Sequence, residues 1–213
     1  MNGNIENKRA VILSACPVSE TMRAYLREDD FVIACDAGYR NLEHLHCKPN
    51  LIVGDFDSAP NPNFPDTVVL PHVKDDTDTQ YAAAWAADHG AKQVLMLGAL
   101  GGKRLEHTIA NLSTGLYLAK RGVNAVIANE QSEIHYFMPG KPLTLSKENW
   151  MYFSVFPLEG KLSGVSIQGA YYPLENAALS MDYPLGVSNE FVQSEVQISC
   201  QGGAGIAILT KAD

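Results

Sequence analysis

Apolar residues are gathered along the first 130 residues in short continuous runs, most of which lack the alternation of polar and apolar positions of a half-exposed strand. The runs lie at 10–16, 31–35, 51–54, 67–70, 93–98 and 124–129. Their length and their β-branched residues are typical of strands buried on both faces, which occur mainly in parallel sheets. We therefore predict a parallel sheet in this part of the chain.

Segments of helical composition separate these runs, at 19–28, 39–45, 78–89 and 106–120. The third carries a start signal, because Thr77 is followed three residues later by Gln80, and Asp78 adds negative charge to the first turn. Strands that alternate with helices indicate right-handed βαβ crossovers. The pattern predicts an α/β domain over residues 1–130.

The pattern changes after Asn129, where helical spacing gives way to short strands separated by Gly, Pro, Ser and Tyr. The expected strands lie at 134–138, 143–146, 151–157, 164–170, 191–199 and 205–210. Clear alternation in "VQSEVQIS" indicates strands with one buried face. We predict a second, antiparallel β domain over residues 131–213.

Composition and charge narrow the classes of protein. The chain has 213 residues, of which 46% are hydrophobic, so global disorder is excluded. A formal net charge of −8 argues against binding to nucleic acid, whose affinity for proteins comes from clustered Lys and Arg. The cysteines form no Cys-x-x-Cys pair, and neither a signal peptide nor an apolar stretch of membrane-spanning length is visible. We expect a soluble, cytoplasmic protein with no membrane partner.

Two groups of acids follow predicted strands. In "LIVGDFDSAP", Asp55 and Asp57 come directly after an apolar run, and they point to the same side if the strand continues, because side chains alternate. Asp75, Asp76 and Asp78 follow the next predicted strand and open a helix. The carboxyl ends of parallel strands meet at one edge of the sheet, where α/β folds bind their ligands.

Carboxylates that converge repel one another, so a cation is expected between them. Hard oxygen ligands without His or Cys suit Mg²⁺, which completes its shell with water and phosphate oxygens. A magnesium nucleotide is therefore the expected ligand. The alternative is that Asp55 and Asp57 only form an Asx turn with Ser58.

The segment "LGALGGKRLEHTIAN" joins a predicted strand to a helix through a glycine-rich turn. Glycines allow backbone N–H groups to approach phosphate, and a helix amino end favours anions. The segment departs from the Walker motif, because Arg104 stands where a Ser or Thr is required after Lys103. The alternative is a plain tight connection between strand and helix.

The blocks "CDAGYRNL", "KPNLIVGDFDS", "KDDTDTQ" and "LGALGGKRLEHTIAN", followed by "YYPLENAALSMDYPLGVSNE", resemble the thiamin pyrophosphokinase family of bacteria over most of residues 31–192. The resemblance implies a Rossmann-like catalytic domain over residues 1–130 and a smaller thiamin-binding β-sandwich domain over residues 131–213. It implies the reaction of ATP with thiamin to give thiamin diphosphate and AMP, with Mg²⁺ as cofactor. It also implies a homodimer with active sites between the subunits.

The resemblance assigns roles to individual residues. Asp55 and Asp57 are similar to the family's metal-binding pair, with Asp75 as the expected third metal ligand, and Asp78 joins these three as a catalytic acid. The expected nucleotide and phosphate ligands are Asp36, Gly38, Gly101, Gly102, Lys103, Arg104 and His107. The expected thiamin ligands are Tyr172, Ser188 and Asn189. The residues alone do not choose between a ligand role for Asp78 and capping of its own helix, or between cation–π contact and packing for Tyr171 and Tyr172.

This chain departs from the family pattern at several positions. The family's D-G-G turn reads Asp36-Ala37-Gly38 here, Lys103 is inserted in the glycine block, and Glu106 replaces an Asp. Two alternatives to thiamin pyrophosphokinase follow. The acceptor could be another alcohol such as a pterin, because an ATP site does not define the acceptor, or the protein could be a thiamin or nucleotide sensor without turnover.

Overall fold

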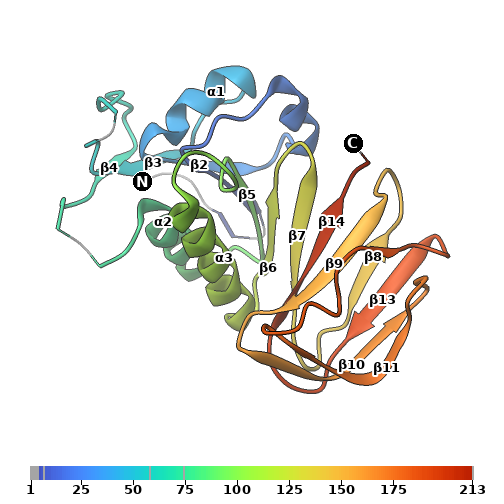
Figure 1. Cartoon of the computed structure of the whole chain (residues 1–213). Helices are drawn as coiled ribbons and strands as arrows, with labels where there is room; N and C mark the ends of the chain where they lie inside the picture. The colour runs from blue at the N-terminus through green and yellow to red at the C-terminus, as the bar shows by residue number, and fades with distance from the viewer. Residues whose placement is uncertain (1–4, 7, 58, 74, 213) are drawn as a thin grey trace. The chain divides into compact units, whose positions relative to one another are not determined.

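The computed structural model describes residues 5–6, 8–57, 59–73 and 75–212. The chain divides into two compact units, Met1–Glu130 and Gln131–Asp213. In Figure 1 the first unit runs from blue to yellow-green and the second from yellow to red. We describe each unit by itself.

Unit 1 contains a parallel sheet. Its strands are β1 (Arg9–Leu13), β2 (Phe31–Cys35), β3 (Leu51–Gly54), β4 (Thr67–Val69), β5 (Gln93–Leu97) and β6 (Asn124–Ala128). They pair in the order β6-β5-β1-β2-β3-β4. The chain moves outward from β1 to β4 and then returns to place β5 on the other side of β1. The topological switch point, where such sheets bind ligands, therefore lies between β1 and β5.

Helices pack against this sheet: η1 (Glu20–Tyr25) and η2 (Asp36–Arg40), which are 3₁₀ helices, and α1 (Asn41–His44), α2 (Asp78–Asp88) and α3 (Leu105–Lys120). Leu13 belongs to a core cluster with Met22 and Leu45. Ile12 is equally buried but points to the opposite face, because strand side chains alternate, and α2 packs against β1. Figure 1 shows α1 and α2 on opposite sides of these strands. None of the described helices is long and apolar enough to cross a membrane.

The expected α-helix at 19–28 is wrong in type. Residues Glu20–Tyr25 form a short 3₁₀ helix whose one buried side chain is Met22, so little packing is available to stabilise a longer α-helix. Residues 36–44 form η2 followed by one turn of α-helix, rather than a single helix at 39–45. The expected helix start at Thr77 is confirmed, because the Thr77 side chain accepts a hydrogen bond from the backbone N–H of Gln80 at 3.1 Å.

Unit 2 is antiparallel. Its strands are β7 (Ser132–Phe137), β8 (Leu143–Ser146), β9 (Tyr152–Pro157), β10 (Lys161–Gln168), β11 (Leu174–Ser180), β12 (Asn189–Glu190), β13 (Glu195–Ser199) and β14 (Gly205–Thr210). They pair in the orders β12-β9-β14-β7 and β11-β10-β13-β8. The core of this unit includes Phe137, Phe153 and Leu162. The sequence prediction missed β11, since Leu179 is its one buried residue, and it missed the two-residue β12.

The fold class predicted from the sequence is confirmed. A Rossmann-like parallel sheet with helices is followed by an antiparallel β-sandwich.

Candidate functional site

The carboxyl ends of the parallel strands bring several polar residues to one edge of the unit 1 sheet. Ser14 follows β1, Asp36 follows β2, Asp55 follows β3, and Gly98 follows β5. Because the paired strands are parallel, these residues leave the sheet in the same direction. The edge includes the switch point between β1 and β5.

Three carboxylates from separate segments meet at this edge. One oxygen each of Asp36, Asp55 and Asp78 lies within 4.8 Å of the others, and all three residues are partly buried. We call this group the acidic cluster. At an effective dielectric constant near 20, two unit charges at that separation repel by roughly 3 to 4 kcal/mol. Burial and the negative charges of Asp78 and Asp36 also raise the pKa of the Cys35 thiol strongly.

The acidic cluster fits a magnesium ion. Its ligand atoms are carboxylate oxygens, the ligands that Mg²⁺ prefers. Oxygens on opposite sides of an octahedral Mg²⁺ are roughly 4.1 Å apart. Adjacent oxygens are roughly 2.9 Å apart. The oxygens of the acidic cluster lie within 4.8 Å of one another, so side-chain rotations that draw them closer would bring the three oxygens onto one ion.

Asp55 also belongs to a second group with Asp57 and His72, whose ligand atoms lie within 4.8 Å of one another. The side chain of His72 is 69% exposed, and its Nδ1 lies 3.9 Å from Oδ2 of Asp55. The backbone N–H of Asp57 donates to Oδ1 of Asp55 at 3.3 Å, which is the local contact of an Asx turn. Ser58, named in the alternative interpretation, lies outside the described residues.

The three predicted metal ligands differ in whether they lie close to other potential ligands. Asp55 joins both groups, Asp57 joins one, and Asp75 is exposed and joins neither of the groups found among the described residues. Asp36 and Asp78, predicted for other roles, lie in the acidic cluster, and His72 was not singled out. A metal-binding role for Asp36 could have been predicted from the sequence, since Asp36 follows a buried strand just as Asp55 does.

The glycine loop after β5 is held by two side chains of α3. The Nδ2 of Asn111, which is 6% exposed, donates to the carbonyl of Ala99 at 2.7 Å. The hydroxyl of Thr108 accepts from the N–H of Gly101 at 3.2 Å. Gly101 and Gly102 themselves are exposed. The loop is thus anchored by α3 while Gly101 and Gly102 face solvent.

The basic residues that follow this loop are exposed. Lys103, Arg104 and His107 lie at the amino end of α3. Nε of Arg104 donates to Oε1 of Glu106 at 2.7 Å, and this hydrogen bond is the main cause that lowers the pKa of the Glu106 carboxyl. Glu106, which replaces the family's Asp, therefore orients Arg104 in this structure.

The turn after β1 is held by a residue that the sequence did not single out. Asn41 is 3% exposed, and its Nδ2 donates to the carbonyls of Ser14 and Cys16. Gly38 packs beside it, and a Cβ there would lie 2.1 Å from the carbonyl oxygen of Leu13. Gly38 therefore allows η2 to approach β1, which is a packing role.

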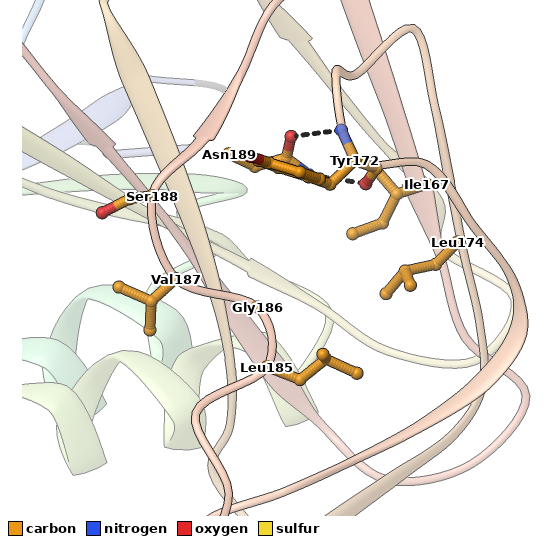
Figure 2. A pocket seen from close by; sticks show the side chains of 8 residues that line it. All are labelled: Ile167, Tyr172, Leu174, Leu185, Gly186, Val187, Ser188 and Asn189. Carbon is orange, nitrogen blue, oxygen red and sulfur yellow. Dashed lines mark hydrogen bonds between the residues drawn. The ribbon is translucent and has the colours of Figure 1, made fainter.

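A cavity of about 410 Å³ opens in unit 2, within the size range of small-molecule pockets. Figure 2 shows its lining residues, which are Ile167, Tyr172, Leu174, Leu185, Gly186, Val187, Ser188 and Asn189. All three predicted thiamin ligands are among them. The lining is mostly apolar, with Ser188 exposed and Asn189 buried. Tyr172 is 61% exposed, and its ring packs edge-on against the ring of Tyr171 at 4.9 Å.

Comparisons with known proteins agree with this architecture. Residues 22–127 match the model of the thiamin pyrophosphokinase catalytic domain, and residues 143–204 match that of the thiamin pyrophosphokinase vitamin B1 binding domain. The curated thiamine pyrophosphokinase of Bacillus subtilis is 27% identical over 194 residues, covering 88% of this chain and 90% of that protein.

Solved structures give the same result. A crystal structure of thiamine pyrophosphokinase from Bacillus subtilis superimposes with a TM-score of 0.87 at 25% identity, covering 97% of this chain and 100% of that one. Thiamin pyrophosphokinase from Geobacillus thermodenitrificans gives 0.84 at 29% identity, covering 96% and 98%. These findings confirm the resemblance predicted from the sequence and favour it over both alternatives. The chain therefore belongs to the thiamin pyrophosphokinase family of pyrophosphotransferases.

Proposed function

We propose that this chain transfers the pyrophosphoryl group of ATP to the hydroxyl of thiamin, giving thiamin diphosphate and AMP, with Mg²⁺ as cofactor. The observation that carries the proposal is the convergence of Asp36, Asp55 and Asp78 at the switch-point edge of the sheet. An anionic polyphosphate approaches such an edge only when a cation offsets the carboxylate charge.

In this proposal the acidic cluster holds the ion, and a bound Mg²⁺ would neutralise charge that develops on the transferred phosphates. Asp57 and Asp75 remain predicted ligands, because both are exposed on the segments after β3 and β4 and are free of core packing. Positioning and charge neutralisation supply most of the acceleration in phosphoryl-type transfer, so little covalent chemistry is required of the protein.

The proposed phosphate contacts come from the loop after β5 and the amino end of α3. The exposed backbone of Gly101 and Gly102 and the amino end of the helix favour anions. Arg104, oriented by Glu106, would add a charge-assisted hydrogen bond, with Lys103 and His107 beside it in the sequence.

Thiamin is proposed to bind in the unit 2 cavity. The exposed face of Tyr172 suits the cationic thiazolium, a contact worth about 0.5 to 2 kcal/mol. The exposed hydroxyl of Ser188 offers a polar contact to the pyrimidine. The homodimer remains a prediction, which light scattering of the purified protein would test, and so does the cytoplasmic location.

The test is product analysis with purified protein, Mg²⁺, ATP and a panel of alcohols that includes thiamin and a pterin alcohol. We expect AMP and thiamin diphosphate in equal amounts, formed only when thiamin and Mg²⁺ are both present. Formation of ADP, preference for another alcohol, or tight thiamin binding without AMP would overturn the proposal.

A further inference from the structure

The side-chain amide of Asn189 is engaged by the protein's own backbone. Its Oδ1 accepts from the N–H of Tyr172 at 2.9 Å and from the N–H of Glu190 at 2.9 Å. Its Nδ2 donates to the carbonyl of Tyr172 at 2.8 Å. Figure 2 shows the two bonds to Tyr172. Asn189 is 5% exposed, so these bonds are shielded from water.

The amide takes the place of a peptide group at the end of a strand ladder. Next to it, the N–H of Val192 donates to the carbonyl of Gly169 at 3.0 Å, and the N–H of Tyr171 donates to the carbonyl of Glu190 at 2.9 Å. Both distances are those of ordinary hydrogen bonds. One residue further the ladder stops, because Ser188 has a left-handed backbone with φ of 56° that turns the chain away. The Asn189 side chain therefore continues the pairing to Tyr172 where the main chain no longer reaches it.

The other side of the cavity is fixed to β9. The N–H of Val155 donates to the carbonyl of Gly186 at 2.8 Å, and Ser154 Oγ accepts from the N–H of Ser188 at 3.0 Å. The wall formed by residues 186–188 is thus attached to a central strand of the sandwich. Asn189 follows this wall directly and reaches across to Tyr172, which forms another wall of the same cavity.

We infer that Asn189 is a positioning residue that sets the width of the unit 2 cavity by holding Tyr172 against the segment 186–188. Asn189 acts mainly through Tyr172, because its oxygen accepts two backbone hydrogen bonds, its nitrogen donates a third, and the residue is only 5% exposed. Of Ser188 and Asn189, it is Ser188 that offers a polar contact to the acceptor, because its side chain is exposed and lines the cavity. The inference rests on the proposed function where it concerns thiamin, and on the hydrogen bonds alone where it concerns Tyr172.

The test compares Asn189→Ala with Asn189→Asp. Alanine removes all three bonds. Aspartate retains the oxygen that accepts from Tyr172 and Glu190, but it loses the donor and turns a carboxylate oxygen toward the carbonyl of Tyr172. The control is Leu145→Ala, which creates a void in the same core on β8, at the opposite edge of its sheet from β11. The control loses stability without touching the cavity lining.

We expect amide exchange at Tyr172 through local opening to become at least about tenfold faster in Asn189→Ala, with a smaller change in Asn189→Asp and none in the control. In turnover with Mg·ATP, the KM for thiamin should rise about tenfold or more in the alanine variant. The kcat and the KM for ATP should stay within about threefold, as expected when uniform binding is lost.

Unchanged Tyr172 exchange in Asn189→Ala, or a thiamin KM that rises no more than in Leu145→Ala, would overturn the inference. If the wild-type protein does not convert thiamin, the proposed function fails, and the exchange measurement still decides whether Asn189 holds Tyr172.

Discussion

The side-chain amide of Asn41 donates a hydrogen bond of 2.9 Å to the carbonyl oxygen of Cys16. The same nitrogen donates to Ser14 O at 3.0 Å, and Oδ1 accepts from the N–H of Val18 at 3.2 Å. A residue of α1 thus holds the turn that follows β1, beside the switch point. The shape of the edge where nucleotide is proposed to bind depends on one buried amide.

Replacing Asn41 by alanine should lower the free energy of unfolding by about 2 to 4 kcal/mol, because three backbone groups lose their buried partner. Urea denaturation followed by circular dichroism measures this change. Asn124→Ala, at an exposed position, should change the free energy by less than about 0.5 kcal/mol. A loss below about 1 kcal/mol in Asn41→Ala would show that water replaces the amide.

Two glycines of the loop after β5 should respond differently to alanine. Gly98 has φ of 64°, and a Cβ there would lie 2.5 Å from Cys16 O and 2.6 Å from Ser14 O. Gly101 has φ of 83° but meets nothing within 4 Å. Gly101→Ala should therefore cost about 1 to 2 kcal/mol of unfolding free energy for the left-handed backbone alone.

Gly98→Ala adds displacement of two carbonyl groups to that conformational cost, so we expect a loss at least twice as large. It should also raise the KM for ATP, because the loops on both sides of the switch point must move apart. Equal losses of stability in the two alanine variants would contradict the close approach at Gly98.

The raised pKa of Cys35 predicts that the free energy of unfolding falls at alkaline pH. Burial and the charges of Asp78 and Asp36 keep the thiol protonated in the folded state, whereas an unfolded thiol ionises near about 8.5. The stability that this group contributes is complete below that pH and is lost as the pH rises. Above pH of roughly 8.5, Cys35 should lower the unfolding free energy by about 1.4 kcal/mol per pH unit.

The comparison is with Cys35→Ser, which removes this titration. Urea denaturation between pH 7 and pH 10 should give a steeper decline for the wild-type protein than for the variant, whatever their difference at pH 7. Parallel declines would mean that Cys35 ionises equally in the folded and unfolded protein.

Buried strands were the elements most accurately predicted from the sequence. The runs "FVIAC" and "LIVG" coincide with β2 and β3, because continuous burial on both faces requires apolar residues throughout. Strand β11 was missed for the converse reason, since Leu179 is its one buried residue and the strand shows no regular alternation. The segment after Ser19 has helical composition, but packing of Met22 alone stabilises only a 3₁₀ helix.

The candidate site was predictable as far as it follows from strand ends. Asp55 was found in this way, and Asp36 satisfies the same rule but was assigned to nucleotide rather than metal. Which acids share one cluster depends on the order of strands in the sheet, and the sequence does not state that order. Asn41 was harder still, because a polar residue that bonds to distant backbone resembles any exposed amide in the sequence. Asn189 was named through the family resemblance as a thiamin ligand, but its hydrogen bonds to the backbone of Tyr172 were not predicted.

Asp55 is the residue common to both groups of potential metal ligands. Asp55→Asn should reduce Mg²⁺-dependent formation of AMP at least about a hundredfold, since a neutral amide is a poorer ligand for Mg²⁺ than a carboxylate. The variant should keep at least the stability of the wild-type protein without metal, because one repelling charge is removed. Asp76→Asn, at an exposed position on the segment that precedes α2, is the matched control and should retain activity.

Direct binding of Mn²⁺ as a magnesium probe, measured by electron paramagnetic resonance without nucleotide, tests the role of the acidic cluster most directly. The account predicts that Mg²⁺ displaces Mn²⁺ from the wild-type protein and from Asp76→Asn, and that Asp55→Asn binds Mn²⁺ at least about tenfold more weakly. Equal Mn²⁺ affinity in the wild-type protein and Asp55→Asn would contradict it.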